Sequence, residues 1–196
     1  MQKKIKPIPL TEFKLRYNLL QAPQESNPDI KDTLRQAAVL IALIQEEGEL
    51  HVLLTRRPTH LRSHPGQISF PGGKVERGDA SLIETALREA AEEIALYPGN
   101  VEVIGQYPAM KTFTGFEITP VIGLVKQAFT PKLAQGEVDE LFTVPLSYLL
   151  QTENRQKQTY QRNGIHHPVY FIRYREHLIW GATAAMINKL CKHLII

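Results

Sequence analysis

The sequence predicts an α/β fold in which a mixed β-sheet has helices packed on both sides. Three observations support this prediction. Apolar runs of strand length recur between residues 37 and 125, helical patterns occupy residues 81–95 and 182–194, and an Asn-Gly pair at residues 163–164 is typical of a hairpin turn. We find no internal repeat, low-complexity segment or boundary of a second domain. A chain of 196 residues therefore fits one domain with a terminal extension.

The N-terminal part is predicted to be an extension that docks on the rest of the chain. Residues 10–20 form a helical pattern, and a linker rich in Pro, Asn, Ser and Glu follows at residues 21–29. We therefore expect a helical extension and linker at residues 1–34 and the main domain at residues 35–196.

The strands are predicted from apolar runs bounded by turn residues. They are residues 37–44, 51–55, 101–107 and 118–125. A turn at residues 46–49 joins the first two strands into a hairpin, and residues 110–116 form the loop between the last two.

The C-terminal third is predicted from propensity and turn signals. Residues 137–150 look helical at both ends, and Pro145 should bend or interrupt that segment. The Asn-Gly pair then joins strands at residues 156–161 and 169–174.

Composition is that of an ordinary soluble globular protein, with 43% hydrophobic and 22% charged residues. The net charge of +3 comes without a basic stripe, so we expect no nucleic-acid partner. No apolar stretch suits a transmembrane helix or a signal peptide, so we expect no membrane partner. The single cysteine, Cys191, favours a reducing compartment and a buried place on the last helix, and we expect a cytoplasmic protein.

Three glutamates carry the first functional signal. Glu89, Glu92 and Glu93 stand at i, i+3 and i+4, so a helix stacks their carboxylates on one face. Like charges placed this way destabilise a helix by a few tenths of a kcal/mol per pair, and a divalent cation would remove that repulsion. The ordinary alternative is a solvated acidic helix face.

A glycine-rich turn precedes the acidic helix and favours the metal site over the solvated face. Residues 70–74 read Phe-Pro-Gly-Gly-Lys, where the backbone can approach a ligand or an ion closely. Ser81 and Glu84 form a capping box that starts the helix, and residues 97–100 end it. Basic residues gather beside this turn and suggest a ligand that carries a polyphosphate. They are Arg56, Arg57, Arg62 and Lys74.

The segment from Gly73 to Leu96 resembles the signature of the Nudix hydrolases, G-x5-E-x7-R-E-U-x-E-E-x-G-U, where U is aliphatic. Three positions depart from it: Asp79 stands for the first Glu, eight residues instead of seven separate it from Arg88, and Ala95 replaces the second Gly. The resemblance implies the Nudix fold, an α/β/α sandwich.

The departures are similar to one branch of the family, the coenzyme A pyrophosphatases. A second signature of that branch, L-L-T-x-R-[S/A]-x3-R-x3-G-x3-F-P-G-G, fits residues 53–73 at every spacing, with Pro58 in place of Ser or Ala. The resemblance extends over residues 37–146 and, more loosely, over residues 180–184.

The acidic helix supplies the expected metal ligands and catalytic groups. Glu89, Glu92 and Glu93 should hold Mg²⁺ or Mn²⁺, and Glu89 and Glu93 lie almost in line because one full turn separates them. By resemblance, a backbone carbonyl of the loop at residues 72–73 joins them. Arg88 should orient a glutamate instead of touching the substrate.

Two parts of the chain could supply the general base. Glu89 or Glu93 would act from the helix, whereas Glu137 or Glu140 would act from a later loop. Glu137 is our loop candidate, and its alternative role is that of an acid favoured at a helix N-terminus.

The resemblance also implies a set of substrate-binding residues. They are Arg57, Arg62, Gly66, Phe70, Gly72, Gly73 and Lys74, with His64 a weaker candidate that is as readily structural or solvent-facing. Aromatic residues that would stack on adenine, unless they belong to the core, are Phe113, Phe116, Tyr148 and Trp180.

The sequence thus resembles a metal-dependent enzyme that cleaves coenzyme A or acyl-CoA to 3′,5′-ADP and (acyl-)4′-phosphopantetheine. The 3′-phosphate of coenzyme A suits Arg57 and Arg62. Alternatives are hydrolysis of ADP-ribose, a dinucleotide cofactor or an oxidised nucleotide, or a non-catalytic nucleotide-binding module. The branch signature argues against the first alternative and the three retained glutamates against the second. We expect a small-molecule partner, and a homodimer stays open.

Overall fold

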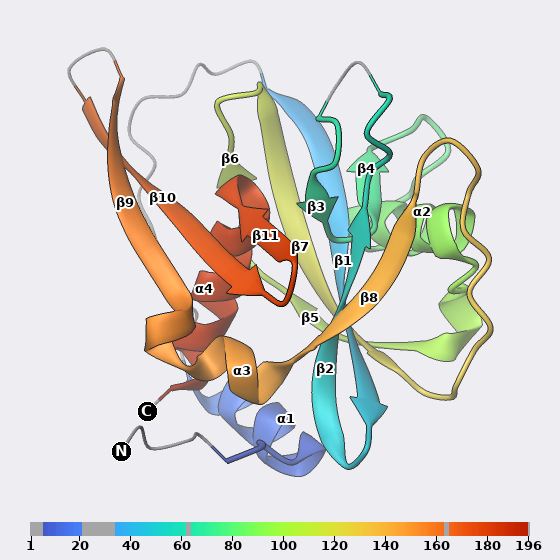
Figure 1. Ribbon diagram of the computed structural model, residues 1–196. Helices are drawn as coiled ribbons and strands as arrows, with labels where there is room; N and C mark the ends of the chain where they lie inside the picture. Colours follow the sequence, from blue (N-terminus) through green and yellow to red (C-terminus); the bar gives the residue numbers. More distant parts are fainter. Residues whose placement is uncertain (1–5, 21–33, 62–63, 163–164, 196) are drawn as a thin grey trace. The chain divides into compact units, whose positions relative to one another are not determined.

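The computed structural model describes residues 6–20, 34–61, 64–162 and 165–195 (Figure 1). Two compact units make up the chain. The first unit comprises Met1–Pro23, Glu46–His51 and Val144–Ile196, and the second unit comprises Gln24–Gln45 and Val52–Thr143. The linker predicted at residues 21–29 lies outside the described residues, and the boundary predicted after residue 34 stays a prediction.

The second unit holds most of an eight-stranded mixed sheet. Its strands are β1 (Arg35–Glu46), β2 (Glu49–Arg56), β3 (Ile68–Ser69), β4 (Gly72–Lys74), β5 (Val101–Gln106), β6 (Met110–Lys111), β7 (Phe116–Val125) and β8 (Glu140–Pro145). The strand order is β3-β2-β1-β7-β5, with β4 on β1, β6 on β7 and β8 on β2. Strands β1 and β7 are parallel, whereas β4 is antiparallel to β1 and β5 is antiparallel to β7. The predicted mixed sheet is therefore confirmed.

Strand β1 is the central strand because its side chains are apolar on both faces. Its segment at residues 37–43 is buried throughout, as expected for a strand whose two faces are both covered. At the turn to β2, Glu47 and Gly48 have φ values of 49° and 81°. Two consecutive residues with positive φ are typical of two-residue hairpin turns. The predicted hairpin is confirmed by this turn and by the adjacency of β1 and β2.

Helix α2 (Leu82–Ile94) begins and ends as the sequence predicts. The Ser81 hydroxyl accepts a hydrogen bond from the Glu84 amide at 3.1 Å, and the Glu84 carboxylate accepts one from the Ala80 amide at 2.7 Å. Ala95 ends the helix in the left-handed conformation, with φ of 59°. The apolar face of α2 packs in the core through Ala86, Ala90 and Ile94. The acidic residues are left on the remaining faces.

The prediction of a helix near residue 137 is wrong. Residues 140–145 form strand β8, and only Leu146–Leu150 is helical, as α3. The segment reads Glu-Leu-Phe-Thr-Val-Pro, whose aromatic and β-branched residues suit a strand, and its pairing with β2 supplies the backbone partners. Pro145 ends β8 and precedes α3, so the predicted interruption falls at the right residue.

The first unit contains a small antiparallel sheet of β9 (Arg155–Arg162), β10 (Ile165–Tyr174) and β11 (His177–Trp180), with β10 in the middle. Helix α4 (Gly181–Leu194) packs on one face, where Ile172 and Ile179 are fully buried. Cys191 is buried on α4, as predicted. The turn predicted at residues 163–164 lies outside the described residues, but the antiparallel register of β9 and β10 confirms the predicted strand pair.

The N-terminal helix α1 (Leu10–Leu19) contacts α4 within the first unit. Phe13 is fully buried, and the Arg16 guanidinium donates a hydrogen bond to the Leu194 carbonyl at 2.6 Å. The rings of Tyr17 and His193 have centroids 5.2 Å apart. In the described part of the chain, no helix is long and apolar enough to cross a membrane.

Candidate active site

Two adjacent glycines bring β4 against both β1 and α2. Gly72 lies opposite Val39 in the β1–β4 pair, and a Cβ atom there would fall 2.5 Å from the Ala38 carbonyl oxygen. A Cβ atom on Gly73 would fall 2.3 Å from Oε1 of Glu89. The first glycine therefore permits strand pairing, and the second leaves room for a carboxylate.

This difference predicts opposite effects of two alanine substitutions. Gly72→Ala collides with main-chain atoms that cannot move independently, so it should lower Tm by several degrees or prevent folding. Gly73→Ala collides only with the end of the Glu89 side chain, so it should keep Tm near wild type while displacing the carboxylate and lowering kcat. Thermal unfolding and steady-state kinetics of both variants check this. A Gly73→Ala enzyme with full kcat would contradict the role of this contact.

Arg88 organises the loop and the acidic helix through hydrogen bonds to four residues. Its Nε and Nη2 atoms donate to the two carboxylate oxygens of Asp79 at 2.9 and 3.1 Å. Nη1 donates to Glu89 at 3.1 Å and to Glu92 at 3.0 Å, and Nη2 also donates to the Lys74 carbonyl at 3.1 Å. Arg88 thus directs its donors at the protein and links both glutamates to the turn before α2.

Asp79 is the buried anchor of Arg88. Its side chain is 4% exposed and also accepts hydrogen bonds from the Thr85 hydroxyl at 2.8 Å and the Glu76 amide at 2.9 Å. The Arg88 hydrogen bond, followed by that of the Glu76 amide, holds the pKa of Asp79 well below its usual range. Asp79 is not among the predicted site residues, because in the sequence it stands out only as a departure from a signature. Its acidic type at that signature position is the signal that could have found it.

Glu89 and Glu93 form a partly buried pair of carboxylates. Glu93 is 6% exposed, and burial raises its pKa to about 8, with the charges of Glu89 and Glu137 adding to the shift and that of Arg57 opposing it. Burial also raises the pKa of Glu89, and Arg88 opposes that change. An excess of negative charge in a poorly solvated place is what a divalent cation neutralises. Glu92 differs, since its side chain is 58% exposed and paired with Arg88.

The raised pKa predicts how the metal-free protein responds to pH. Between the unfolded pKa of Glu93, about 4.5, and its folded pKa, about 8, the folded state binds more protons than the unfolded state. The free energy of unfolding should therefore fall as pH rises through this window, by at most about 1.4 kcal/mol for each pH unit. In Glu93→Gln the free energy of unfolding should fall less with pH, and this variant should be more stable than the wild type at pH 8. Urea unfolding with a chelator at pH 5 and pH 8 measures the effect. A steeper fall in Glu93→Gln would contradict it.

The loop before β8 brings Glu137 to the same pair. The negative charge of Glu137 acts on both Glu89 and Glu93. Backbone hydrogen bonds tie this loop to the end of α2, from the Lys132 amide to the Ile94 carbonyl at 3.2 Å and from the Ala134 amide to the Glu93 carbonyl at 2.8 Å. A carboxylate from a distant part of the sequence thus lies close to the helix glutamates.

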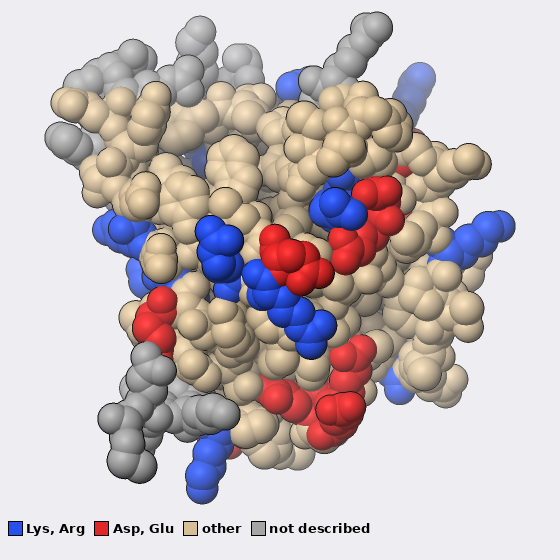
Figure 2. Space-filling model, viewed as in Figure 1, with Lys and Arg blue, Asp and Glu red and all other residues tan. Residues whose placement is uncertain are grey.

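Arg56 fixes the other end of that loop. Its carbonyl accepts a hydrogen bond from the Asp139 amide at 2.9 Å, and its guanidinium pairs with the carboxylates of Asp139 at 2.9 Å and Glu140 at 2.8 Å. Figure 2 shows acidic and basic side chains lying against one another along β8 on this face. Glu140 is therefore engaged with Arg56, whereas the charge of Glu137 acts on the helix glutamates.

The other predicted substrate residues are not all brought together. Arg57 lies close enough to Glu93 for its charge to lower the pKa of that carboxyl, and Lys74 is exposed beside Arg88. Phe70 is 1% exposed, so its side chain belongs to the core. Gly66, with φ of 67°, forms a turn before β3. Arg62 lies outside the described residues.

The remaining candidates are scattered over the two units. His64 is exposed, and Phe113 is 51% exposed. Phe116 lies under the Arg35 guanidinium, 4.1 Å from ring centroid to Cζ. In the first unit, the Tyr148 hydroxyl donates to the Arg173 carbonyl, and Trp180 is 46% exposed.

Comparison with known proteins identifies the family. The sequence model of the NUDIX domain family matches residues 34–163. The chain therefore belongs to this family of Nudix hydrolases. It is similar over 92% of its length to a protein of Enterobacter sp. (strain 638) named "Uncharacterized Nudix hydrolase NudL", with 43% identity over 92% of that protein. A protein of the same name from Yersinia enterocolitica is 42% identical, over 95% of this chain and 94% of its own.

Solved structures agree on the fold. A MutT/nudix family protein from Enterococcus faecalis matches 93% of this chain and 68% of its own, with a TM-score of 0.50 and 16% identity. The predicted Nudix fold is confirmed, and the chain is a Nudix hydrolase, a class of enzyme that uses divalent metal ions to hydrolyse the pyrophosphate of nucleoside diphosphate derivatives.

Proposed function

We propose that this enzyme hydrolyses the pyrophosphate bond of coenzyme A or acyl-CoA and releases 3′,5′-ADP and (acyl-)4′-phosphopantetheine. The observation that carries the proposal is the branch signature at residues 53–73, because it adds basic residues beside the acidic helix. Arg57 belongs to that signature, and its charge acts on Glu93. A cation close to the carboxylate pair is suited to a phosphate group of the substrate.

The residues suit Mg²⁺ or Mn²⁺ as the metal. Glu89 and Glu93 would be the principal ligands and Glu92 a further one, because hard divalent ions prefer carboxylate oxygens. The absence of a side chain at Gly73 gives the Glu89 carboxylate its room. When bound, the ion neutralises charge on the phosphoryl oxygens and lowers the pKa of a water.

Different side chains of the protein would have different roles in hydrolysis. The oxygen of a water forms a bond to one phosphorus, the bridging P–O bond breaks, and a carboxylate accepts the proton of the water. We propose Glu137 for that carboxylate, since its charge reaches the helix pair and Glu140 is paired with Arg56. Arg88 positions Glu89 and Glu92.

Glu137→Gln should separate the base from the metal ligands. If Glu137 accepts the proton, the variant loses kcat by about 100-fold or more while its affinity for Mn²⁺ stays near wild type. Kinetics across pH together with Mn²⁺ titration make the measurement, and Glu153→Gln, at an exposed glutamate of the first unit, is the control for the loss of one carboxylate. Unchanged kcat would indicate that Glu89 or Glu93 accepts the proton. A parallel loss of Mn²⁺ binding would indicate that Glu137 is a metal ligand.

A substrate panel with product identification tests the proposed function. Coenzyme A, acetyl-CoA, dephospho-CoA, ADP-ribose and NADH are each offered at one concentration with Mg²⁺ and then Mn²⁺. We expect the highest kcat/KM for coenzyme A or acetyl-CoA and 3′,5′-ADP among the products. Faster hydrolysis of ADP-ribose or NADH would show that the enzyme acts on another nucleoside diphosphate derivative.

A further inference from the structure

The small sheet of the first unit has one covered face and one exposed apolar face. Side chains alternate between the faces of a strand, so Ile172 and Ile179 point to α4 and their neighbours point the other way. Phe171 and Trp180 are such neighbours, and they lie directly opposite each other in the β10–β11 pair. Two aromatic rings thus stand side by side on the face away from α4.

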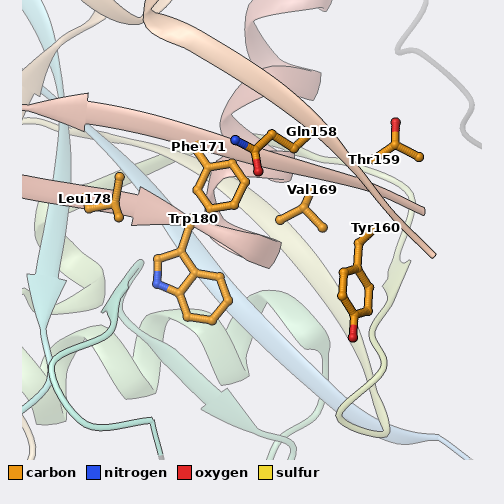
Figure 3. Close-up of a pocket in the computed structure, with 7 residues that line it drawn as sticks. All are labelled: Gln158, Thr159, Tyr160, Val169, Phe171, Leu178 and Trp180. Carbon is orange, nitrogen blue, oxygen red and sulfur yellow. The ribbon is translucent and has the colours of Figure 1, made fainter. Parts of the chain in front are cut away.

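A pocket with a volume of about 530 Å³ lies on this exposed face. Its apolar lining is Tyr160, Val169, Phe171, Leu178 and Trp180. Figure 3 shows the rings of Phe171 and Trp180 close together, with Val169 beside them and Tyr160 farther along β9. The side chains remain accessible, with 63% of Tyr160, 46% of Trp180 and 42% of Leu178 exposed.

The size and charge of the pocket fit a small neutral molecule. Its volume falls within the range of about 300–1,000 Å³ that is typical of small-molecule sites. A stable protein interface needs roughly 20–30 residues on each side, far more than line this pocket. No side chain that lines it carries a formal charge, so the bound part of the ligand should be uncharged.

The shape and the remaining polar groups favour a flat ring over an alkyl chain. An open face of aromatic side chains favours a planar group that can stack on it. The amide of Gln158 is drawn beside the ring of Phe171 in Figure 3, and an amide both donates and accepts hydrogen bonds. A nucleobase offers a planar ring with donors and acceptors at its edge.

We propose that this face of the first unit binds a nucleobase, by stacking on Tyr160, Phe171 and Trp180 and hydrogen bonding to Gln158. The site uses no residue of α2 and no metal, so it stands or fails separately from the proposed hydrolysis.

The fluorescence of Trp180 measures the proposed binding directly, since the chain contains one tryptophan. The whole protein is titrated with adenosine in the presence of a chelator, so that hydrolysis plays no part. We expect saturable quenching of the tryptophan emission, because a base stacked on the indole ring changes its excited state.

Two exposed tyrosines provide matched variants, with Tyr160 63% exposed in the pocket and Tyr97 66% exposed on the second unit. Tyr160→Ala should weaken adenosine binding by about 5- to 100-fold, as expected for the loss of one stacking ring. Tyr160→Phe keeps the ring and should bind as the wild type does. Tyr97→Ala should also leave the titration unchanged.

Hexanamide, a neutral alkyl amide, is titrated alongside adenosine. Tighter binding of hexanamide than of adenosine would overturn the proposal in favour of an alkyl-chain site. Quenching by adenosine that is linear, or that Tyr160→Ala leaves unaltered, would also overturn it, as would dimerisation in sedimentation that Tyr160→Ala abolishes.

Discussion

Glu93→Gln and, separately, Glu89→Gln are expected to lower kcat by at least about 100-fold, because each removes a carboxylate that we propose as a ligand of the ion that neutralises phosphoryl charge. Both side chains are partly or fully withdrawn from water, with Glu93 6% exposed and the Glu89 side chain 16% exposed. Folding should survive, since each substitution removes repulsion and keeps the shape of the side chain. The measurement is kcat at saturating coenzyme A and saturating Mg²⁺.

Glu153→Gln serves as the control for the loss of one negative charge, because Glu153 is exposed on the first unit. Circular dichroism of all three variants is used to check that the fold is kept. Full activity in both helix variants would show that α2 is not the catalytic centre.

If the enzyme acts on coenzyme A as proposed, replacing Arg57 or Arg62 by Ala should reveal whether either of them contacts the 3′-phosphate. A charge-assisted contact contributes roughly 1.5–3 kcal/mol, so its loss should lower kcat/KM for coenzyme A by about 10- to 150-fold. Dephospho-CoA lacks the 3′-phosphate, and its kcat/KM should barely change in the variant that has lost this contact. The comparison of the two substrates isolates one phosphate group.

The position of Arg57 near the carboxylate pair makes the second substrate necessary. General damage to that pair would lower kcat/KM for both substrates equally. Arg77→Ala, at an exposed arginine after the glycine loop, is the matched control and should leave both unchanged. Equal losses of kcat/KM for coenzyme A and dephospho-CoA in both the Arg57 and the Arg62 variant would show that neither arginine recognises the 3′-phosphate.

Elements that depend on neighbouring residues could be predicted from the sequence. The capping pair Ser81 and Glu84 and the apolar spacing of Ala86, Ala90 and Ile94 determine α2 within 15 residues. Strand β8 depends on β2, which lies more than 80 residues earlier, and local propensity gave the wrong answer there. Strands β3 and β4, of two and three residues, are too short to leave a periodic pattern.

The same distinction holds at the candidate site. The spacing of Glu89, Glu92 and Glu93 is by itself enough to predict that they share one helix. The partnership of Arg88 with Asp79 bridges the turn before α2. The nearness of Glu137 to the helix glutamates depends on a loop that is hydrogen-bonded to the end of α2. Such approaches arise from the folded backbone and have no local pattern in the sequence.

The anchoring of the loop that carries Glu137 has a consequence for motion. Hydrogen bonds at Lys132, Ala134 and Asp139 hold its backbone on both sides of Glu137. If Glu137 is the base, we therefore expect it to reach the substrate by rotation about its own side-chain torsions, within picoseconds to nanoseconds, and not by closure of a lid over microseconds to milliseconds. Because these hydrogen bonds form without a ligand, binding should cost little backbone entropy in this loop. We therefore expect that bringing this carboxylate into place adds no slow step to turnover.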